Sequence, residues 1–533
     1  MASSIAATLA LSCTLLSALP QVDANPHNSK TLNWASCDQA STEAAEFPID
    51  CANITVPLEY GNPKSEPLEL QLLRVKATKE PVKGSVLWNP GGPGDSGLGN
   101  ILLLGGRALG GHFNFISFDP RGTGSTIPFV CDTGNDTEST GELSTRDTGN
   151  NTVVGQDPWK LLSSRAWRDG GAYVDSCAPA INKVGRYLGT AAVARDMLRI
   201  VEALGEDGKL RFWGTSYGTI LGQTFAAMFP DRVDRLLFDS TMPTEDYYVG
   251  HWGSALEGAD DSLSNYFSEC ITAGPTVCPL ANYSGPSTKP QDLTSALNEA
   301  FAELIKNPVL LPDSFPPLLP WWQPGGVTLY SQLKYRAFTF LYNAGKFGKL
   351  NNIVSLTLAR NWTGLTELIA DVPADELKAP SQYAFHGIAC AESALRAKSL
   401  DELYSVIQYQ AGKSNWADTF GPQVWPCAQW PVKAVEIFEG AIRNVTTKVP
   451  ALFVNGAYDP ITPLRGAWEA SASFPMSRVL IHKGHGHGVM NHPSNCTIKA
   501  ITEYFEEGKL PKNGVECEPD QTAFELYKAL VGA

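Results

Sequence analysis

One serine lies in a setting that could make it a nucleophile. Ser216 is flanked at two residues on either side by Gly214 and Gly218, after the apolar run 210–213 and before the helix-like stretch 219–229. A G-x-S-x-G sequence between a strand and a helix predicts a tight turn that holds the serine hydroxyl out from the sheet edge. The helix N-terminus behind such a turn favours developing negative charge. The pattern therefore indicates nucleophilic chemistry at Ser216.

A serine hydroxyl needs a base to take its proton and an acidic group to orient that base. Both residue types occur after Ser216 in the chain, each behind an apolar run. Asp459 follows the run 451–454, and His487 lies in the glycine-rich segment 484–488 after the run 478–481. We therefore expect Ser216, Asp459 and His487 to converge at one edge of a sheet.

Each of these two partners has a rival. Asp239 also follows an apolar run, at 235–238, and His485 lies two residues before His487. Asp459 and His487 are favoured, but the residues alone leave both alternatives open. A zinc site at these histidines is disfavoured, because no further ligands occur at suitable spacing.

The glycine-rich segment 88–94 follows another apolar run, 85–88. Glycines let the backbone approach a substrate closely, and we predict that the backbone N–H groups of Gly92 and Tyr217 form an oxyanion hole. A phosphate-binding loop is disfavoured, because no G-K-[ST] follows. We expect no cofactor and no metal.

Short apolar runs alternate with helical patterns such as 191–204, which predicts a mostly parallel sheet with helices on both faces. Ligands of such sheets bind beyond the carboxyl ends of the strands. The alternation breaks between 241 and 449, a helix-rich stretch with Pro- and Trp-rich interruptions. We expect a core of residues 25–240 and 450–533 with an inserted helical lid at 241–449. A separate domain starting near Thr241 is the alternative, but the last two strands would then lack a sheet to join.

The overall composition excludes some classes of function. Charged residues make up 18% of the chain, hydrophobic residues 43%, and the net charge is -14. A compact globular protein is therefore expected, and no basic stripe is available for nucleic acid. Residues 1–24 resemble a secretory signal peptide, although no Lys or Arg precedes the apolar stretch. No other stretch has the length of apolar sequence needed to span a bilayer. A secreted monomer that stays off the membrane after signal cleavage is expected.

Cysteine usage agrees with export. Ten of the eleven cysteines lie outside the signal segment, enough for five bridges in an oxidising compartment. Sequence neighbours suggest the pairs Cys37–Cys51, Cys270–Cys278, Cys390–Cys427 and Cys496–Cys517, which would leave Cys131 with Cys177. The connectivity itself does not follow from the sequence. Seven N-x-[ST] acceptors also predict an N-glycosylated surface. They are Asn53, Asn135, Asn150, Asn282, Asn361, Asn444 and Asn495.

Five motifs together resemble the secreted tripeptidyl aminopeptidases, which are serine exopeptidases related to prolyl aminopeptidases. The motifs are the segments 89–94, 118–125, 214–218, 459–463 and 486–488. The resemblance extends from about residue 34 to residue 517. It implies an α/β-hydrolase fold with a helical lid and removal of short peptides or single residues from free N-termini. It also supports Asp459 over Asp239 and His487 over His485.

The same resemblance suggests where the substrate amine binds. The segment 386–393 is similar to one in which the family usually has Cys-x-Asp, and here Glu392 takes the acidic position. Our hypothesis is that Glu392 holds the α-ammonium group of the substrate. The alternative is a solvated helix carboxylate.

Two other function classes remain open. An esterase or thioesterase for small acyl substrates would use the same three residues, because a fold does not settle its substrate. A non-catalytic, hydrolase-like binding protein is disfavoured by the complete set of Ser216, Asp459 and His487. Epoxide hydrolases and dehalogenases are disfavoured because enzymes of that kind carry Asp where Ser216 stands.

Overall fold

The computed structural model describes residues 31–38, 41–42, 45–104, 109–132, 158–312, 315, 328–370, 382–440 and 442–531. The expected signal peptide, Asn135 and Asn150 lie outside these ranges. None of the helices within them is both long and apolar enough to cross a membrane.

A nine-stranded sheet forms the base of the molecule. Its strands are β1 (Ile49–Pro57), β2 (Pro67–Val75), β3 (Ser85–Asn89), β4 (Asn114–Phe118), β5 (Leu210–Thr215), β6 (Val233–Asp239), β7 (Leu452–Tyr458), β8 (Arg478–His485) and β9 (Val515–Cys517). Their order across the sheet is β1-β2-β4-β3-β5-β6-β7-β8-β9. The strands from β4 to β9 in this order pair in parallel, which confirms the mostly parallel sheet predicted from the alternating pattern.

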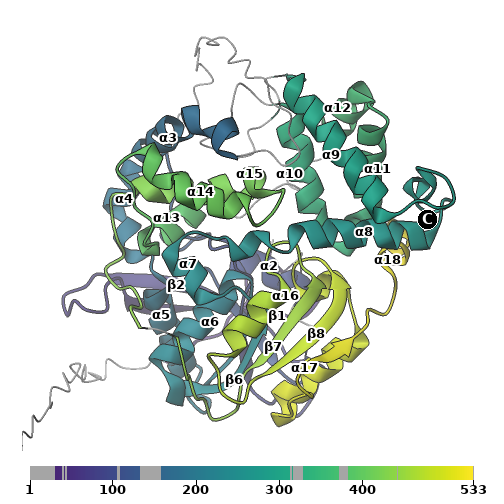
Figure 1. Cartoon of the computed structure of the whole chain (residues 1–533). Helices are drawn as coiled ribbons and strands as arrows, with labels where there is room; N and C mark the ends of the chain where they lie inside the picture. The colour runs from purple at the N-terminus through teal and green to yellow at the C-terminus, as the bar shows by residue number, and fades with distance from the viewer. Residues whose placement is uncertain are drawn as a thin grey trace, which may run out of the picture.

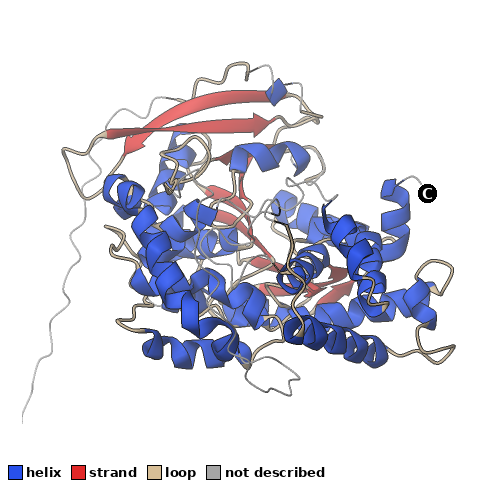
Figure 2. Ribbon diagram, turned by 90° about the horizontal axis from the view of Figure 1, so that it is seen from above, coloured by secondary structure: helices blue, strands red, loops and turns tan. Residues whose placement is uncertain are grey.

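The antiparallel hairpin of β1 and β2 at one edge is an addition that the sequence analysis does not predict. Side chains of β2 alternate between buried and exposed over most of its length, as in a strand covered on one face only. Figure 2 shows the hairpin as two long arrows at the edge of the sheet, with helices on both sides of the remaining strands.

Helices cover both faces of the sheet. One face packs against α5 (Thr190–Ala203), α6 (Tyr217–Met228) and α16 (Leu464–Ser471). The other face packs against α2 (Gly97–Leu104) and α17 (Asn495–Glu507). The central strands are buried on both faces as a result, and every residue of β3 is buried.

A second layer, which we call the helical layer, lies between β6 and β7 in the chain. It comprises α7 (Thr244–Val249), α8 (Ala259–Ala273), α9 (Pro290–Lys306), α10 (Leu329–Leu341), α11 (Phe347–Leu358), α12 (Trp362–Ala370), α13 (Gln382–Glu392), α14 (Tyr404–Ala411), α15 (Ala417–Phe420) and the 3-10 helix η8 (Gly421–Gln429). Figure 1 shows α8 to α15 together on one side of β6, β7 and β8. The sheet continues across this long segment, because Phe238 of β6 pairs with Phe453 of β7.

Two helices from outside the range 241–449, the first near the start of the chain's middle part and the second at its C-terminal end, pack against this layer. The helix α3 (Pro158–Ser176), within the range expected to form the core, packs against α14, α15 and η8, and Figure 1 shows it beside α14. The helix α4 (Ala178–Lys183) follows it. The C-terminal helix α18 (Ala523–Val531) packs against α8 and α11.

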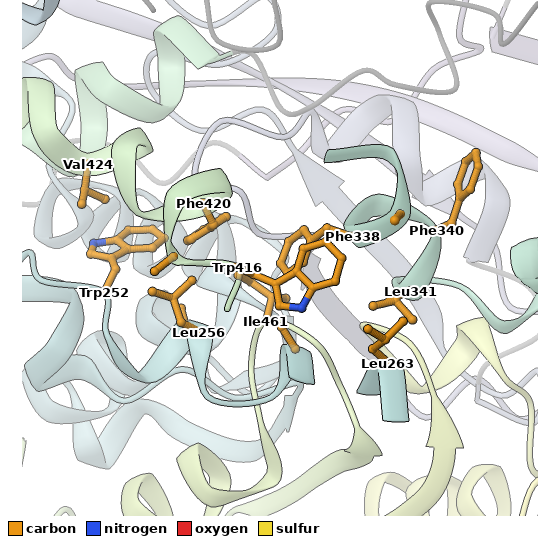
Figure 3. Close-up of a cluster of buried hydrophobic side chains, with 14 of the residues drawn as sticks. Trp252, Leu256, Leu263, Phe338, Phe340, Leu341, Trp416, Phe420, Val424 and Ile461 are labelled. Atoms are coloured by element: carbon orange, nitrogen blue, oxygen red, sulfur yellow. The ribbon is translucent and has the colours of Figure 1, made fainter. Parts of the chain in front are cut away.

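Aromatic side chains fill the interior of the helical layer. Trp252, Phe420, Phe338 and Trp416 form a continuous group in Figure 3, with ring centroids 5.7–6.3 Å apart between neighbours. Ile461, from the loop after β7, belongs to the same buried cluster. The loop that carries Asp459 therefore packs into the apolar interior of the helical layer.

Five disulfides among the described residues join the pairs suggested by the cysteine spacing. The bonds join Cys37 to Cys51, Cys131 to Cys177, Cys270 to Cys278, Cys390 to Cys427 and Cys496 to Cys517. Each bond closes a loop of fewer than 50 residues, the longest separation being 46.

A buried ion pair ties the edge hairpin to the core. Arg121 donates to both carboxylate oxygens of Asp196 at 2.7 and 2.8 Å, and both side chains are fully buried. The same guanidinium donates to the backbone carbonyls of Pro57 and Leu58 at the end of β1. Tyr60 adds a hydroxyl donor to Asp196 at 2.8 Å. The pair therefore joins β1, the segment after β4 and helix α5.

We expect Asp196→Asn to lower the free energy of unfolding by about 3–5 kcal/mol, because it leaves a buried guanidinium without its counter-charge. Glu469→Gln is a matched control: Glu469 pairs with the exposed Arg465, and its loss is expected to cost at most about 1 kcal/mol. Urea unfolding followed by tryptophan fluorescence measures both. Equal unfolding midpoints for the two variants would contradict the assigned role of the pair.

Candidate active site

Ser216 lies in the turn between β5 and α6, with φ 58° and ψ −125°. Glycine is required at the two flanking positions because a side chain at either one would collide with the backbone. A Cβ at Gly214 would lie 2.3 Å from the Gly218 carbonyl oxygen, and one at Gly218 would lie 2.5 Å from the Asn89 carbonyl oxygen. Positive φ at a serine is strained and persists where the surrounding structure fixes it. The turn therefore has the tight geometry expected from the sequence.

The loops after β7 and β8 bring Asp459 and His487 together. The His487 Nδ1 atom lies 3.0 Å from Asp459 Oδ2 and 3.2 Å from Oδ1. The Asp459 carboxylate is fully buried and also accepts the N–H groups of Ile461 and Thr462 at 3.0 and 2.9 Å. The Thr462 hydroxyl lies 2.8 Å from Asp459 Oδ2 and 3.0 Å from His487 Nδ1. This arrangement fixes the imidazole ring through one nitrogen and leaves Nε2 for chemistry.

Ser216 and His487 line the same cavity, which has a volume of about 840 Å³. Within the described residues, the hydrogen bonds of His487 reach Asp459, Thr462 and the backbone around it, and none joins it to the Ser216 hydroxyl. In unliganded enzymes a bond between nucleophile and base is often long, and it tightens when substrate binds.

Charge around His487 favours its protonated form. Burial disfavours an imidazolium, but the nearby charge and hydrogen bond of Asp459, with further contributions from Asp239 and Asp95, outweigh burial and raise the pKa of His487. An imidazolium formed when His487 takes a proton is therefore stabilised in place.

Among the described residues, neither rival side chain hydrogen-bonds to this pair. Asp239 accepts the Trp213 indole N–H at 3.3 Å and the Val489 N–H at 3.1 Å, and burial raises its pKa to about 6. His485 is buried with its Nε2 atom 2.9 Å from the Asn265 side chain and lies outside the cavity lining. The structure thus brings Asp459, not Asp239, to the imidazole.

The loop after β3 packs directly on the serine turn. A Cβ at Gly91 would lie 2.7 Å from the Ser216 Cβ atom, and Gly91 has φ +107°. The Gly91 N–H donates to the Asn89 side chain at 3.1 Å, which holds the loop. Gly92 and Tyr217 both line the cavity, and the Tyr217 N–H belongs to the first turn of α6, where no carbonyl of the helix can accept it. The residues of both predicted oxyanion donors therefore line the same cavity as Ser216.

The helical layer holds the histidine loop, which the sequence analysis does not foresee. The backbone N–H of His487 donates to the Tyr342 carbonyl at 2.9 Å. The Asn343 side chain donates to the Asn491 side chain at 2.9 Å, and the Asn491 amide donates to the His487 carbonyl. Tyr342 and Asn343 belong to no recognisable sequence motif, so the sequence gives no means of predicting their contacts with His487. Thr462 differs, because its position three residues after Asp459 places a hydroxyl where it can reach the Asp459 carboxylate.

The structure does not bring Glu392 to the cavity wall. Its carboxylate is buried at 3% exposure and accepts the N–H and hydroxyl of Thr190 at 2.7 and 2.6 Å and the Tyr247 hydroxyl at 2.9 Å. Burial raises the pKa of Glu392 to about 7, against these hydrogen bonds. The Thr190 hydroxyl also lies 2.6 Å from the Tyr217 hydroxyl, so Glu392 sits behind Tyr217.

Comparisons with known proteins agree with this geometry. A family model described as alpha/beta hydrolase fold matches residues 84–271, and one described as TAP-like protein matches residues 413–517. A tripeptidyl aminopeptidase of Streptomyces lividans is 25% identical over 513 residues, which cover 92% of this chain and 87% of the relative. Serine protease Hip1 of Mycobacterium bovis is 26% identical over 523 residues, covering 93% and 92% of the two chains. Carboxylesterase B of Mycobacterium tuberculosis is 23% identical over 504 residues, covering 91% and 90%.

The first of the two family models covers the strands β3 to β6 and the Ser216 turn, and the second covers the segments that carry Asp459 and His487. The chain is a serine hydrolase of the α/β-hydrolase fold, similar to the tripeptidyl aminopeptidases and to serine protease Hip1.

Proposed function

We propose that this chain is a serine exopeptidase that releases tripeptides, shorter peptides or single residues from free N-termini. The observation that carries the proposal is the His487–Asp459 pair, at 3.0 Å, whose imidazole lines the same cavity as the strained Ser216 turn. Relatives named tripeptidyl aminopeptidase and serine protease support a peptide substrate.

In the proposed mechanism, His487 Nε2 takes the proton of Ser216 as its oxygen attacks the scissile carbonyl carbon. The N–H groups of Gly92 and Tyr217 stabilise the oxyanion of the tetrahedral intermediate. The His487 imidazolium gives its proton to the leaving amine, and the C–N bond breaks to leave an acyl-enzyme ester on Ser216. Water then attacks that ester with His487 again acting as base, and Asp459 orients the imidazole throughout.

We also propose that the helical layer forms a lid domain over this site. Core loops contribute Gly92, Ser216 and His487 to the cavity wall, and the helical layer contributes Phe338 and Phe385. A substrate bound between the two would be shielded from water.

Secretion and glycosylation belong to the same proposal. Five disulfides favour an oxidising compartment. The glycosylation acceptors within the described residues, which are Asn53, Asn282, Asn361, Asn444 and Asn495, all have exposed side chains.

Ser216→Ala is expected to reduce kcat/KM by at least about 10⁴-fold and to abolish labelling by a fluorophosphonate probe, since the probe reacts with an activated serine. Ser125→Ala, in an exposed loop, is the matched control and is expected to retain both. Persistent labelling of the Ser216→Ala variant would show that the nucleophile is another residue.

Substrate class is tested with a panel of chromogenic compounds. We expect Ala-Ala-Pro anilide with a free N-terminus to be cleaved at least about 10-fold more efficiently than its N-acetylated form, because a charge-assisted contact to the amine is worth 1.5–3 kcal/mol. Hydrolysis of short acyl esters without cleavage of either anilide would instead support an esterase, as in the relative named carboxylesterase B.

The raised pKa of His487 sets the pH dependence. The imidazole must be neutral to accept the Ser216 proton, so kcat/KM is expected to fall as the pH drops through a value above the ordinary 6.5. Asp459→Asn removes the charge that opposes the effect of burial, so the acidic limb should move to lower pH while kcat at neutral pH falls roughly 10⁴-fold. An unmoved limb in that variant, measured on a short acyl ester, would rule out His487 as the titrating base.

A further inference from the structure

One carboxylate in the cavity wall has no part in the proposed mechanism. Asp95 follows Gly92 and Gly94 in the loop after β3 and lines the cavity beside Ser96 and Asn100. Among the lining residues that the structure describes, Asp95 is the one carboxylate, and none is Lys or Arg. A cavity with this charge pattern selects a cation or a neutral group.

The Asp95 carboxylate is half-buried and has no hydrogen-bonding partner among the described residues. Burial raises its pKa to about 6, and the nearby charge of His487 lowers it only in part. No hydrogen bond from a described residue contributes. At neutral pH the group is therefore ionised but only partly solvated, and an incoming N–H donor with a positive charge would relieve that penalty.

The fully buried carboxylates near the site already have their donors. Asp459 accepts four protein groups, Asp239 accepts an indole and a backbone N–H, and Glu392 accepts three groups behind Tyr217. Of these four carboxylates, Asp95 is the one that presents free acceptor oxygens to a ligand in the cavity.

The loop that carries Asp95 is held firmly. A Cβ at Gly91 would lie 2.7 Å from the Ser216 Cβ atom, and one at Gly94 would lie 2.8 Å from the Ala384 Cβ atom of α13. Gly92 and Asp95 are three residues apart, a separation that spans at most about 11 Å. A group bound by Asp95 therefore lies within a short span of chain from the predicted oxyanion donor.

We propose that Asp95, rather than Glu392, binds the α-ammonium group of the substrate and so gives the enzyme its preference for free N-termini. This inference rests on the proposed exopeptidase function. The substrate ammonium donates charge-assisted hydrogen bonds to the Asp95 oxygens while the scissile carbonyl lies at Gly92 and Tyr217. The short loop between the two contacts favours small N-terminal pieces.

The test compares the wild-type enzyme with Asp95→Asn, which keeps the shape and removes the charge. Ala-Ala-Pro anilide is supplied with a free or an acetylated N-terminus, at a pH above the His487 limb. We expect the free-to-acetylated ratio of kcat/KM to fall by about 10–100-fold in the variant, mainly through KM. Glu392→Gln is the matched carboxylate-to-amide control and is expected to shift that ratio by less than about 3-fold. An unchanged ratio in Asp95→Asn, or an equal loss on both substrates, would overturn the proposal.

A second measurement does not depend on peptide cleavage. The tripeptide Ala-Ala-Pro and its acetylated form are used as competitive inhibitors of the hydrolysis of a short acyl ester. Wild-type enzyme is expected to bind the free-amine form at least about 10-fold more tightly, and Asp95→Asn is expected to lose this preference. Wild-type enzyme that hydrolyses the ester but neither anilide would refute the exopeptidase function, and the inhibition constants would still decide the role of Asp95. Equal inhibition of the wild-type enzyme by the two peptides would overturn the proposed role of Asp95.

Discussion

Parallel pairing of the central strands is the constraint on which the site depends. Because β3, β5, β6, β7 and β8 run in the same direction, the loops that follow them all leave from one edge of the sheet. Asn89 at the end of β3 pairs with Gly214, and Tyr458 at the end of β7 pairs with His485. Residues that are more than 200 positions apart in the sequence thus meet because their strands end together.

Close backbone contact then converts this shared edge into a defined site. The Ser216 turn, the Asn89 carbonyl and Gly91 touch one another so tightly that no side chain fits at Gly214, Gly218 or Gly91. Such contacts leave the serine and the expected oxyanion donors little freedom relative to each other. Positions fixed before substrate arrives require no reorganisation during the reaction, which is the main source of electrostatic catalysis.

The sequence predicted the parts of the site that depend on local pattern. The Ser216 turn follows from its flanking glycines and apolar neighbours, and the strands β3 to β8 follow from their apolar runs. The hairpin of β1 and β2 was missed because the predicted strands rested on continuous apolar runs, whereas apolar and polar residues alternate over most of β2. Asp95 was missed because nothing local distinguishes an unpaired carboxylate from a solvated one. For Glu392 the reverse holds. Similarity to a family segment identified the residue, but it did not show which hydrogen-bond donors its carboxylate would contact.

The contacts of His487 bear on how the helical layer could work. A lid that moved as an independent body would leave the core loops as they are. Here the His487 N–H donates to the Tyr342 carbonyl, and Asn343 bonds to Asn491, which in turn donates to the His487 carbonyl. Displacement of the segment after α10 would therefore remove two of the supports of the histidine loop. Asp459 would still hold the ring through Nδ1, but the backbone that carries the ring would lose its fixed position. It follows that the segment after α10 is part of the arrangement that keeps the imidazole at the cavity.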